Sequence, residues 1–463
     1  MKIKITFVAF SLLFSCSTFS NTLQDAEFFY EDENYPKAFE LYKDLASIGC
    51  KGAQYSLVNM YINGEGVDKS LAHAYAWSTL LGLAGDEASL EIRSDVETKL
   101  KGMQLARANE IYLELNQQYG PQAIGKRYFF SSTEPGVDFV PARFIATAFS
   151  RSSIRLLPLE KAEEFALVSF DVDEKGITRN HRVEYSSDRN RKKAAIRIVG
   201  QSRYTPSTLN NKPIASYRLS TTIGFNRNNE YFIANDENLI ATTYRKILED
   251  LTGKEVKEES FVSEEFALFT LENRKSTSVL SGSPIAWLTS AASCGEALAQ
   301  REIGLLHLHG AGSTYNADKA IFWLTRASEN GDDVATYVLG RYLLDRSQLS
   351  GIKFLKAASK SLDEANLALA WHYATSAPKA SDNNRSVDLA KFYFSKVKKH
   401  LFNDHHTYYQ VRAAVESATG NFKSAKKSIK KAIKIAKASD FYLEDLEQYE
   451  KIIHSKNRIV VNP

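Results

Sequence analysis

The segment IAWLTSAASCG at residues 285–295 decides the fold, because its spacing recurs elsewhere in the chain. A tryptophan is followed eight residues later by a glycine in three places: Trp77 and Gly85, Trp287 and Gly295, and Trp323 and Gly331. The second and third tryptophans are 36 residues apart, and Leu41 with Gly49 lies 36 residues before the first pair. A fixed period of this length indicates stacked copies of one structural unit.

Each unit is predicted to be a pair of helices. Alanine follows the glycine by four residues at Ala53, Ala299 and Ala335. The spacing G-x-G occurs at residues 64–66 and 310–312, where glycine permits the positive φ of a tight turn. One such pair cannot bury its apolar stripe alone, whereas stacked pairs can.

These residues resemble the Sel-one-like repeat, a relative of the tetratricopeptide repeat, over about residues 22–100 and 285–440. Further units are indicated by LAWHY at 369–373, after a shortened loop around Ser347 to Gly351, and by GNFKSA at 420–425. The resemblance implies a protein-binding solenoid in which no repeat residue is catalytic.

The middle of the chain has a different pattern. Residues 165–172 are rich in aromatic and β-branched side chains and alternate most clearly near their end, which predicts a strand. Turn chemistry at 173–176 and a returning strand over 177–186 predict a hairpin. A helix over 189–201 and a third strand over 216–225 complete the order strand, strand, helix, strand.

This order resembles the C-terminal domain of the TonB energy-transducer family, on residues 168–176, 194–196, 203–206 and 211–214. The resemblance implies a grip on an extended peptide of an outer-membrane transporter, by strand addition beside the last strand. The implied partner-binding edge consists of Ser216, Tyr217, Arg218, Leu219, Ser220, Thr221, Thr222, Ile223, Gly224 and Phe225.

The full role of a transducer does not fit the rest of the sequence. A transducer needs a proline-rich spacer across the periplasm, and this chain has only 10 prolines spread along its length. The module is also central, with a long helical region after it. The sequence therefore favours a binding or packing module over energy coupling.

The first twenty residues predict export. Lys2 and Lys4 precede the apolar run 5–14, and small residues follow, as in a secretory signal peptide. Cleavage after Ser20 is preferred, and lipidation at Cys16 is the alternative. We therefore expect a periplasmic chain, with membrane contact only through such a lipid or through a membrane-bound partner.

Composition and charge exclude several classes of protein. Hydrophobic residues at 44% and charged residues at 25% are typical of a globular chain. The net charge of +4 gives no support for nucleic-acid binding, and 3 cysteines exclude a disulfide scaffold. Cys50 and Cys294 both adjoin a repeat glycine; a bridge between them is open, but buried free thiols are expected.

Charge is unevenly distributed along the chain. Residues 21–120 carry twice as many acidic as basic side chains, whereas 155–226 are basic. Opposite charge allows the two regions to dock, or the basic region to bind an acidic partner, but the preferred explanation is two solvated faces that simply differ. Residues 423–437 hold seven lysines opposite an apolar stripe, which suits either anionic lipid or, as we prefer, a solenoid surface beside the acidic segment 440–447.

No enzyme or metal site is predicted. Asp171, Asp173, Glu174 and Gly176 faintly match a calcium loop, but a hairpin turn explains them. The pairs His307/His309 and His405/His406 have no further ligands at useful spacing, and no nucleotide-binding or triad motif is present. No metal, cofactor or catalytic residue is therefore expected.

The sequence thus predicts a mainly α protein whose solenoid arms flank a small α+β module. The expected division is a signal peptide at 1–20, repeats at 21–120, the TonB-like module at 140–226, a helical connector at 227–280 and repeats at 281–457. The preferred function is a non-enzymatic adaptor for envelope proteins. The alternatives are an energy transducer with proton-channel partners of the ExbB and ExbD type, or an enzyme with a site between the modules.

Overall fold

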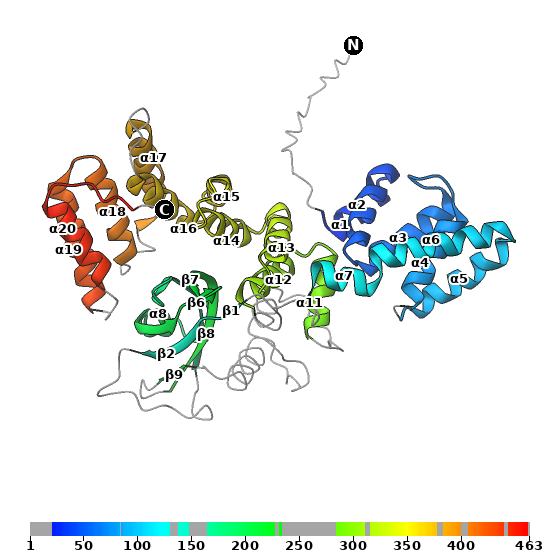
Figure 1. Ribbon diagram of the computed structural model, residues 1–463, viewed down its shortest axis with the longest axis horizontal. Coiled ribbons are helices and arrows are strands. Elements are labelled where there is room, and N and C mark those ends of the chain that lie inside the picture. The colour runs from blue at the N-terminus through cyan, green and yellow to red at the C-terminus, as the bar shows by residue number, and fades with distance from the viewer. Residues whose placement is uncertain are drawn as a thin grey trace, which may run out of the picture.

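The computed structural model describes residues 21–83, 85–129, 138–147, 164–226, 231–233, 284–310, 315–376, 383–399, 406–438 and 443–461. Within these ranges the chain forms two helical arms and one small α/β module (Figure 1). The mainly helical prediction is confirmed. The expected signal peptide 1–20 lies outside the described residues.

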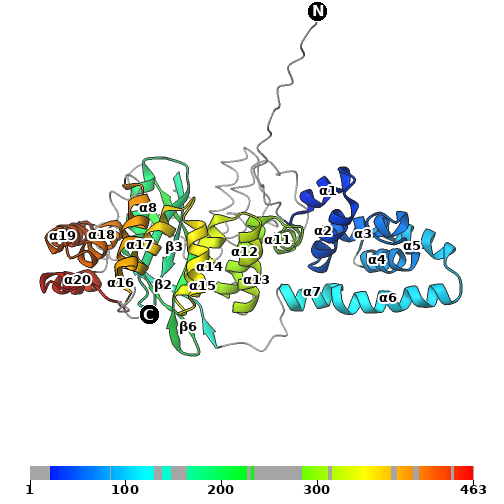
Figure 2. The same cartoon turned by 90° about the horizontal axis from the view of Figure 1, so that it is seen from above.

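The N-terminal arm consists of α1 (Leu23–Glu31), α2 (Tyr35–Ser47), α3 (Lys51–Asn63), α4 (Leu71–Leu83), α5 (Glu87–Lys99), α6 (Met103–Tyr119) and α7 (Pro121–Tyr128). Each helix from α1 to α4 packs on the next, and α6 packs back on α4. Figure 2 shows α6 and α7 returning along the arm toward the middle of the molecule. The helical region therefore extends eight residues beyond the predicted boundary at 120.

The C-terminal arm consists of α11 (Pro284–Ser293), α12 (Ala297–His309), α13 (Ala317–Glu329), α14 (Asp333–Leu344), α15 (Ser350–Ala358), α16 (Asp363–Thr375), α17 (Asn383–Lys396), α18 (His406–Ala418), α19 (Phe422–Ala438) and α20 (Glu444–His454). A single hydrophobic cluster runs from α12 to α20 and extends to Ile459. Successive helices bury one another's apolar stripes, as stacked repeats require.

The repeat glycines have nearly the same backbone geometry in both arms. The φ angles are +99° at Gly49, +93° at Gly85, +97° at Gly295 and +91° at Gly331. Each glycine follows the second helix of a pair, where a left-handed residue ends the helix. The repeat alignment made from the sequence is therefore confirmed at these four positions.

Small residues inside the repeat permit close helix packing. A Cβ atom at Gly304 would lie 2.7 Å from the Leu324 side chain, so α12 and α13 could not approach as they do. Trp323 of α13 is fully buried beside this contact. The expectation that small residues bring paired helices together is confirmed here.

The α/β module consists of β1 (Phe139–Val140), β2 (Arg143–Thr147), β3 (Glu164–Val172), β4 (Thr178–Ser186), α8 (Arg191–Gln201), β5 (Ser202–Thr205), β6 (Ser207–Leu209), β7 (Lys212–Ile214), β8 (Ser216–Phe225) and β9 (Tyr231–Ile233). Its main sheet is antiparallel, in the order β4-β3-β8-β9. Ala195, Ile198 and Val199 of α8 pack against β3 and β8. The predicted order strand, strand, helix, strand is observed.

Strand β9 corrects one prediction. Residues 227–280 were expected to be a helical connector, but Tyr231–Ile233 pairs with the end of β8. Antiparallel pairing with the end of β8 satisfies backbone N–H and C=O groups of these residues, so they need no helix to do so. The remainder of that segment lies outside the described residues.

The described parts of the two arms meet at a joint. Its core combines Ile48, Ile124 of α7, Leu288 of α11 and Trp323 of α13. Arg326 of α13 binds Asp44 of α2 with two hydrogen bonds of 2.7 Å. Because α6 and α7 return to this point, the α/β module is inserted in the sequence where the helical arms are joined in space. No described helix is long and apolar enough to cross a membrane.

Candidate functional site

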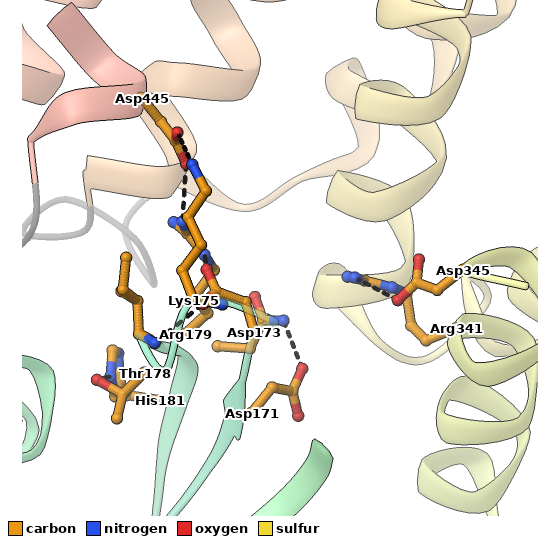
Figure 3. A network of polar contacts seen from close by, with 11 residues as sticks. Asp171, Asp173, Lys175, Thr178, Arg179, His181, Arg341, Asp345 and Asp445 are labelled. Carbon is orange, nitrogen blue, oxygen red and sulfur yellow. Dashed lines mark hydrogen bonds and ion pairs between the residues drawn. The ribbon is translucent and has the colours of Figure 1, made fainter. Parts of the chain in front are cut away.

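The candidate site is the contact between the α/β module and the C-terminal arm. Strand β8 packs on α12 and α14, and Tyr217 belongs to the same hydrophobic cluster as Leu305 and Tyr342 of the arm. Phe139 of β1 stacks on Tyr315 with ring centroids 4.6 Å apart. Around this apolar contact lie three groups of polar interactions, and Figure 3 labels Asp445 of the first group, Asp345 of the second and Asp171 of the third.

The first group holds the β3–β4 hairpin to α20. Lys175 Nζ lies 2.7 Å from Asp445 Oδ1, and Arg179 Nη2 lies 3.2 Å from Asp445 Oδ2. Arg179 Nε also binds Asp173 Oδ2 at 2.7 Å. The hydrogen bond to Asp445 raises the pKa of Lys175. The hairpin thus presents two cations to one carboxylate of the arm.

The hairpin turn fixes the position of these cations. The Asp173 carboxylate accepts hydrogen bonds from the backbone N–H groups of Lys175 and Ile177, at 3.0 and 2.9 Å. Gly176 has a φ of +76°, and a Cβ atom there would lie 1.9 Å from the Tyr204 carbonyl oxygen. The prediction of a hairpin turn with glycine at the positive-φ position is confirmed.

The second group lies where β8 meets α12 and α14. The Tyr217 hydroxyl donates to Asp345 Oδ2 at 2.7 Å, and burial, followed by the Asp345 charge, raises the pKa of Tyr217 well above its usual value. His309 Nε2 donates to the Tyr217 carbonyl at 2.6 Å. Burial lowers the pKa of His309 to about 4, so the ring is neutral at pH 7 with its proton on Nε2.

The third group centres on Asp171 of β3. Its carboxylate accepts from the Asn180 side chain at 2.7 Å and from the Arg218 backbone N–H at 2.9 Å. Asn180 and Arg218 have φ angles of 51° and 54°, and the pairing register of β3 shifts beside both. Asp171 therefore bridges two irregular points, one on each neighbouring strand.

These two irregular points turn side chains toward the arm. Asn180 Nδ2 also donates to the Tyr337 hydroxyl of α14 at 3.3 Å, and the Arg218 guanidinium lies 5.8 Å from the centre of the Tyr337 ring. Positive φ at a non-glycine residue costs about 1–3 kcal/mol. The contacts with the arm offset that cost, so the bulges are part of the docking arrangement.

Strand β8 is covered in part along the edge that the sequence predicted to be open, and peptide binding there stays a prediction. Ile223–Phe225 pairs with β9, and Ser216–Phe225 pairs with β3 on the other side. Near the start of the strand, the Tyr217 carbonyl accepts a hydrogen bond from His309. The sequence correctly placed the strand, but β9 and the docking of α12 were not visible in its local pattern.

Cys50 and Cys294 form a disulfide, so the expectation of free thiols is wrong. The Cys294 carbonyl accepts a hydrogen bond from the Leu23 N–H at 2.9 Å, and Asn330 binds both Asn21 N and the Gly295 carbonyl. The start of α1 is therefore held against the end of α11. This geometry brings together two cysteines that are separated by 244 positions.

The polar groups of this contact were also compared with the needs of a metal site. No group of three or more His, Cys, Asp or Glu side chains in the described ranges is placed to hold a metal ion. Asp171, Asp345 and Asp445 each accept hydrogen bonds from protein groups. These hydrogen bonds connect β3, β8 and the β3–β4 hairpin with one another and with the C-terminal arm.

Sequence reasoning missed the arm's half of this contact. Asp345, Asp445, His309 and Tyr337 belong to no local motif, because their roles arise from folding over long separations. One signal was available in the basic charge of residues 155–226. Two of these basic residues, Lys175 and Arg179, pair with Asp445 of the C-terminal arm, rather than with the acidic N-terminal arm considered from the sequence.

A helical-repeat protein with an inserted α/β module is the class that this architecture defines. Comparison with known proteins supports the repeats: residues 52–86 and 297–332 match the Sel1 repeat family model. No curated protein matches the chain. The resemblance of residues 140–226 to TonB C-terminal domains stays a prediction.

Two solved structures are similar to this chain. One is a Sel1 repeat protein from Oxalobacter formigenes, with 15% identity and a TM-score of 0.21, covering 80% of this chain and 99% of that one. The other is a protective antigen present in uropathogenic Escherichia coli strains that displays an SLR fold. It has 16% identity and a TM-score of 0.24, and covers 95% of this chain and 88% of that one.

Proposed function

We propose that this chain is a non-enzymatic adaptor that binds other proteins of the cell envelope through its repeat arms. Sel1 repeats generally mediate protein–protein interaction, and two segments of the chain match that repeat. The observation that carries the proposal is the way in which the C-terminal arm binds the α/β module. It uses repeat helices to hold a folded module through Tyr217–Asp345, His309–Tyr217 and Lys175–Asp445 contacts.

The N-terminal arm is the proposed surface for an external partner. The hydrogen bonds of the inserted module described above go to the C-terminal arm. On the N-terminal arm, Met103 is 89% exposed and Leu113 is 63% exposed. Met103 borders an open hollow whose other lining residues include Leu71, Leu100 and Arg107. A flexible thioether beside a hollow suits contact with a partner's apolar side chains.

The proposed location is an oxidising compartment outside the cytoplasm. The Cys50–Cys294 disulfide supports this location, because disulfides persist in the periplasm and are rare in cytosolic proteins. The apolar segment at residues 5–14 also supports export from the cytoplasm. Mass spectrometry of the mature N-terminus tests it: a start at Asn21 or a lipidated Cys16 agrees, and a cytosolic chain that begins at Met1 does not.

The adaptor proposal is tested by crosslinking in cells. A photoreactive amino acid at Met103 or Leu113 should give a defined adduct, identified by mass spectrometry. The variant Met103→Glu with Leu113→Glu should lose partner recovery by about tenfold, because two charges are placed in an apolar contact. Leu349→Glu is the control, since Leu349 is equally apolar and 71% exposed on the other arm.

Two outcomes contradict this proposal. One is the absence of any adduct at the N-terminal arm in living cells. The other is undiminished recovery by the double variant while circular dichroism shows that its helices are intact. Either result removes the N-terminal arm as the partner surface, and the control variant shows whether a surface charge alone disturbs recovery.

A transport role in the manner of a TonB-type transducer is the second proposal, favoured by the observed order β3, β4, α8, β8. Among the described strands, β4 pairs only with β3 and β9 covers only the end of β8, so a peptide strand could be added beside β4 or beside the first part of β8. An uncleaved N-terminal anchor is required for energy coupling. A mature protein that begins at Asn21 or at Cys16 rules this role out.

A further inference from the structure

Helix α19 (Phe422–Ala438) carries a concentrated positive charge that the protein interactions above do not use. It contains no acidic residue. Its basic residues are Lys423, Lys426, Lys427, Lys430, Lys431, Lys434 and Lys437. The helix belongs to the end of the C-terminal arm, between α18 and α20 in the chain (Figure 2).

The helix arranges five of these lysines in one row. Successive spacings of four, three, four and three residues from Lys423 to Lys437 keep the side chains on one face over roughly 21 Å, at 1.5 Å per residue. All five side chains of this row are exposed. We call Lys423, Lys427, Lys430, Lys434 and Lys437 the lysine row.

The opposite face of α19 is already occupied. Ala425, Ile429, Ala432 and Ala436 are fully buried, and the helix packs on α18 and α20. The apolar stripe of α19 therefore packs inside the arm, as the preferred sequence interpretation of a helix on the solenoid surface requires. The lysine row must then face away from the arm's core.

Nearby acids do not neutralise the row. Among the described residues, none of the seven α19 lysines forms an ion pair, and Lys431 instead lies 4.3 Å from the centre of the Tyr409 ring. Glu416 of α18 is bound by Arg412 and by Ser428, at 2.9 and 2.6 Å. Asp445 of α20 is turned to Lys175 and Arg179. The positive charge is thus directed to solvent.

We propose that the lysine row docks the end of the C-terminal arm onto an anionic membrane surface. Clusters of four to eight lysines on one helix face are attracted to acidic phospholipid headgroups, through charge and without a shaped pocket. Because the apolar stripe is packed inside the arm, this contact is electrostatic and peripheral, with no insertion of the helix. The docking is independent of the partner surface proposed on the N-terminal arm.

The residue types favour a membrane over nucleic acid. The row contains no arginine for bidentate phosphate binding and no exposed aromatic ring for base stacking, and Phe422 packs against the arm's core. The Cys50–Cys294 disulfide also favours an oxidising compartment, which is bounded by phospholipid.

Vesicle binding by the full chain tests the proposal. One set of vesicles contains only phosphatidylcholine, and the other contains phosphatidylcholine with about 30% phosphatidylglycerol. The protein should bind only the second set at low salt and be released as ionic strength rises, since exposed charges are screened. Changing all five residues of the row to glutamine should weaken binding at least ~100-fold.

A matched variant controls for net charge. Lys37, Lys43, Lys101, Lys353 and Lys360 are also exposed and lie on other helices or loops, so changing these five to glutamine removes the same charge. This variant should bind the anionic vesicles nearly as well as the unaltered protein. Thermal unfolding of both variants confirms that each remains folded.

Three results would overturn the proposal. Equal losses in the two variants would show a general charge effect. Vesicle binding that survives removal of the row would place the lipid contact elsewhere. The third result is that the unaltered protein does not bind vesicles but binds a single-stranded nucleic-acid probe or associates with itself. Loss of that binding or self-association in the row variant would assign the row to another partner.

Discussion

Cys50 and Cys294 are covalently joined at the point where the two helical arms meet, although 244 positions separate them in sequence. The bond closes a loop that contains α3 to α7 and the entire α/β module. It lies beside hydrogen bonds and ion pairs that also connect the arms, including Arg326–Asp44. The joint is therefore held both by packing and by a covalent link.

Removal of this link should destabilise the joint. Cys50→Ala with Cys294→Ala is expected to lower the free energy of unfolding by about 2–4 kcal/mol, because the unfolded chain regains the entropy of the open loop. Thermal unfolding with and without dithiothreitol measures the effect. The reductant should lower the midpoint of the unaltered protein and leave that of the double variant unchanged; an unaffected parent protein would contradict the structural role.

The ion pairs at Asp445 should hold the β3–β4 hairpin to α20. Asp445→Asn is expected to cost about 1 kcal/mol, since both partner cations are partly solvated. Hydrogen exchange of residues 173–179 should become faster, and added salt should reduce the difference from the parent protein. Glu447→Gln, an exposed acid on the same helix, is the control and should leave exchange in this hairpin unchanged.

Acid should weaken the contact between β8 and α12 through His309. Burial lowers the pKa of this residue to about 4 in the folded protein, below the ~6.5 of an unfolded chain. The stability from keeping the ring neutral is fully present above pH ~6.5 and declines as the pH falls toward 4, by on the order of 3 kcal/mol.

The variant His309→Gln separates this effect from other acid titrations. Glutamine keeps a donor for the Tyr217 carbonyl but does not titrate. Denaturant unfolding of both proteins at several pH values between 7 and 4 should show a smaller loss for the variant. Parallel pH profiles would refute the assignment.

Replacement by alanine should destabilise the protein much more at Gly176 than at Gly420, which has nearly the same backbone φ angle. Gly176 and Gly420 have φ angles of +76° and +75°, but only at Gly176 would a Cβ atom meet a backbone oxygen, 1.9 Å away. Gly420→Ala is expected to cost about 1 kcal/mol from the left-handed backbone alone. Gly176→Ala should cost more than 3 kcal/mol, because the turn or Tyr204 must move.

Thermal unfolding of the two alanine variants provides this comparison directly. Hydrogen exchange of β4 and β5 should also increase in Gly176→Ala and not in Gly420→Ala. Similar destabilisation of the two variants would show that the backbone angle, and not the close approach to Tyr204, governs both positions.

Local sequence patterns determined the elements of this protein. The eight-residue interval from Trp323 to Gly331 and its equivalents gave the helix pairs, because the positions at which a helix must be small or must end are fixed within one unit. The strands and helix of the inserted module were also predictable, since alternation and turn residues act over a few positions. Strand β8 was predicted with its observed bounds, Ser216–Phe225.

Tertiary structure alone decided how these elements are used. Whether β8 is open depends on β9 and on His309, and whether two cysteines meet depends on the return of α6 and α7 to the joint. Asp345 and Asp445 became docking residues only because the fold brings α14 and α20 against β8 and the β3–β4 hairpin. Such contacts join residues far apart in the chain, and no local period records which distant surface will bury a given side chain.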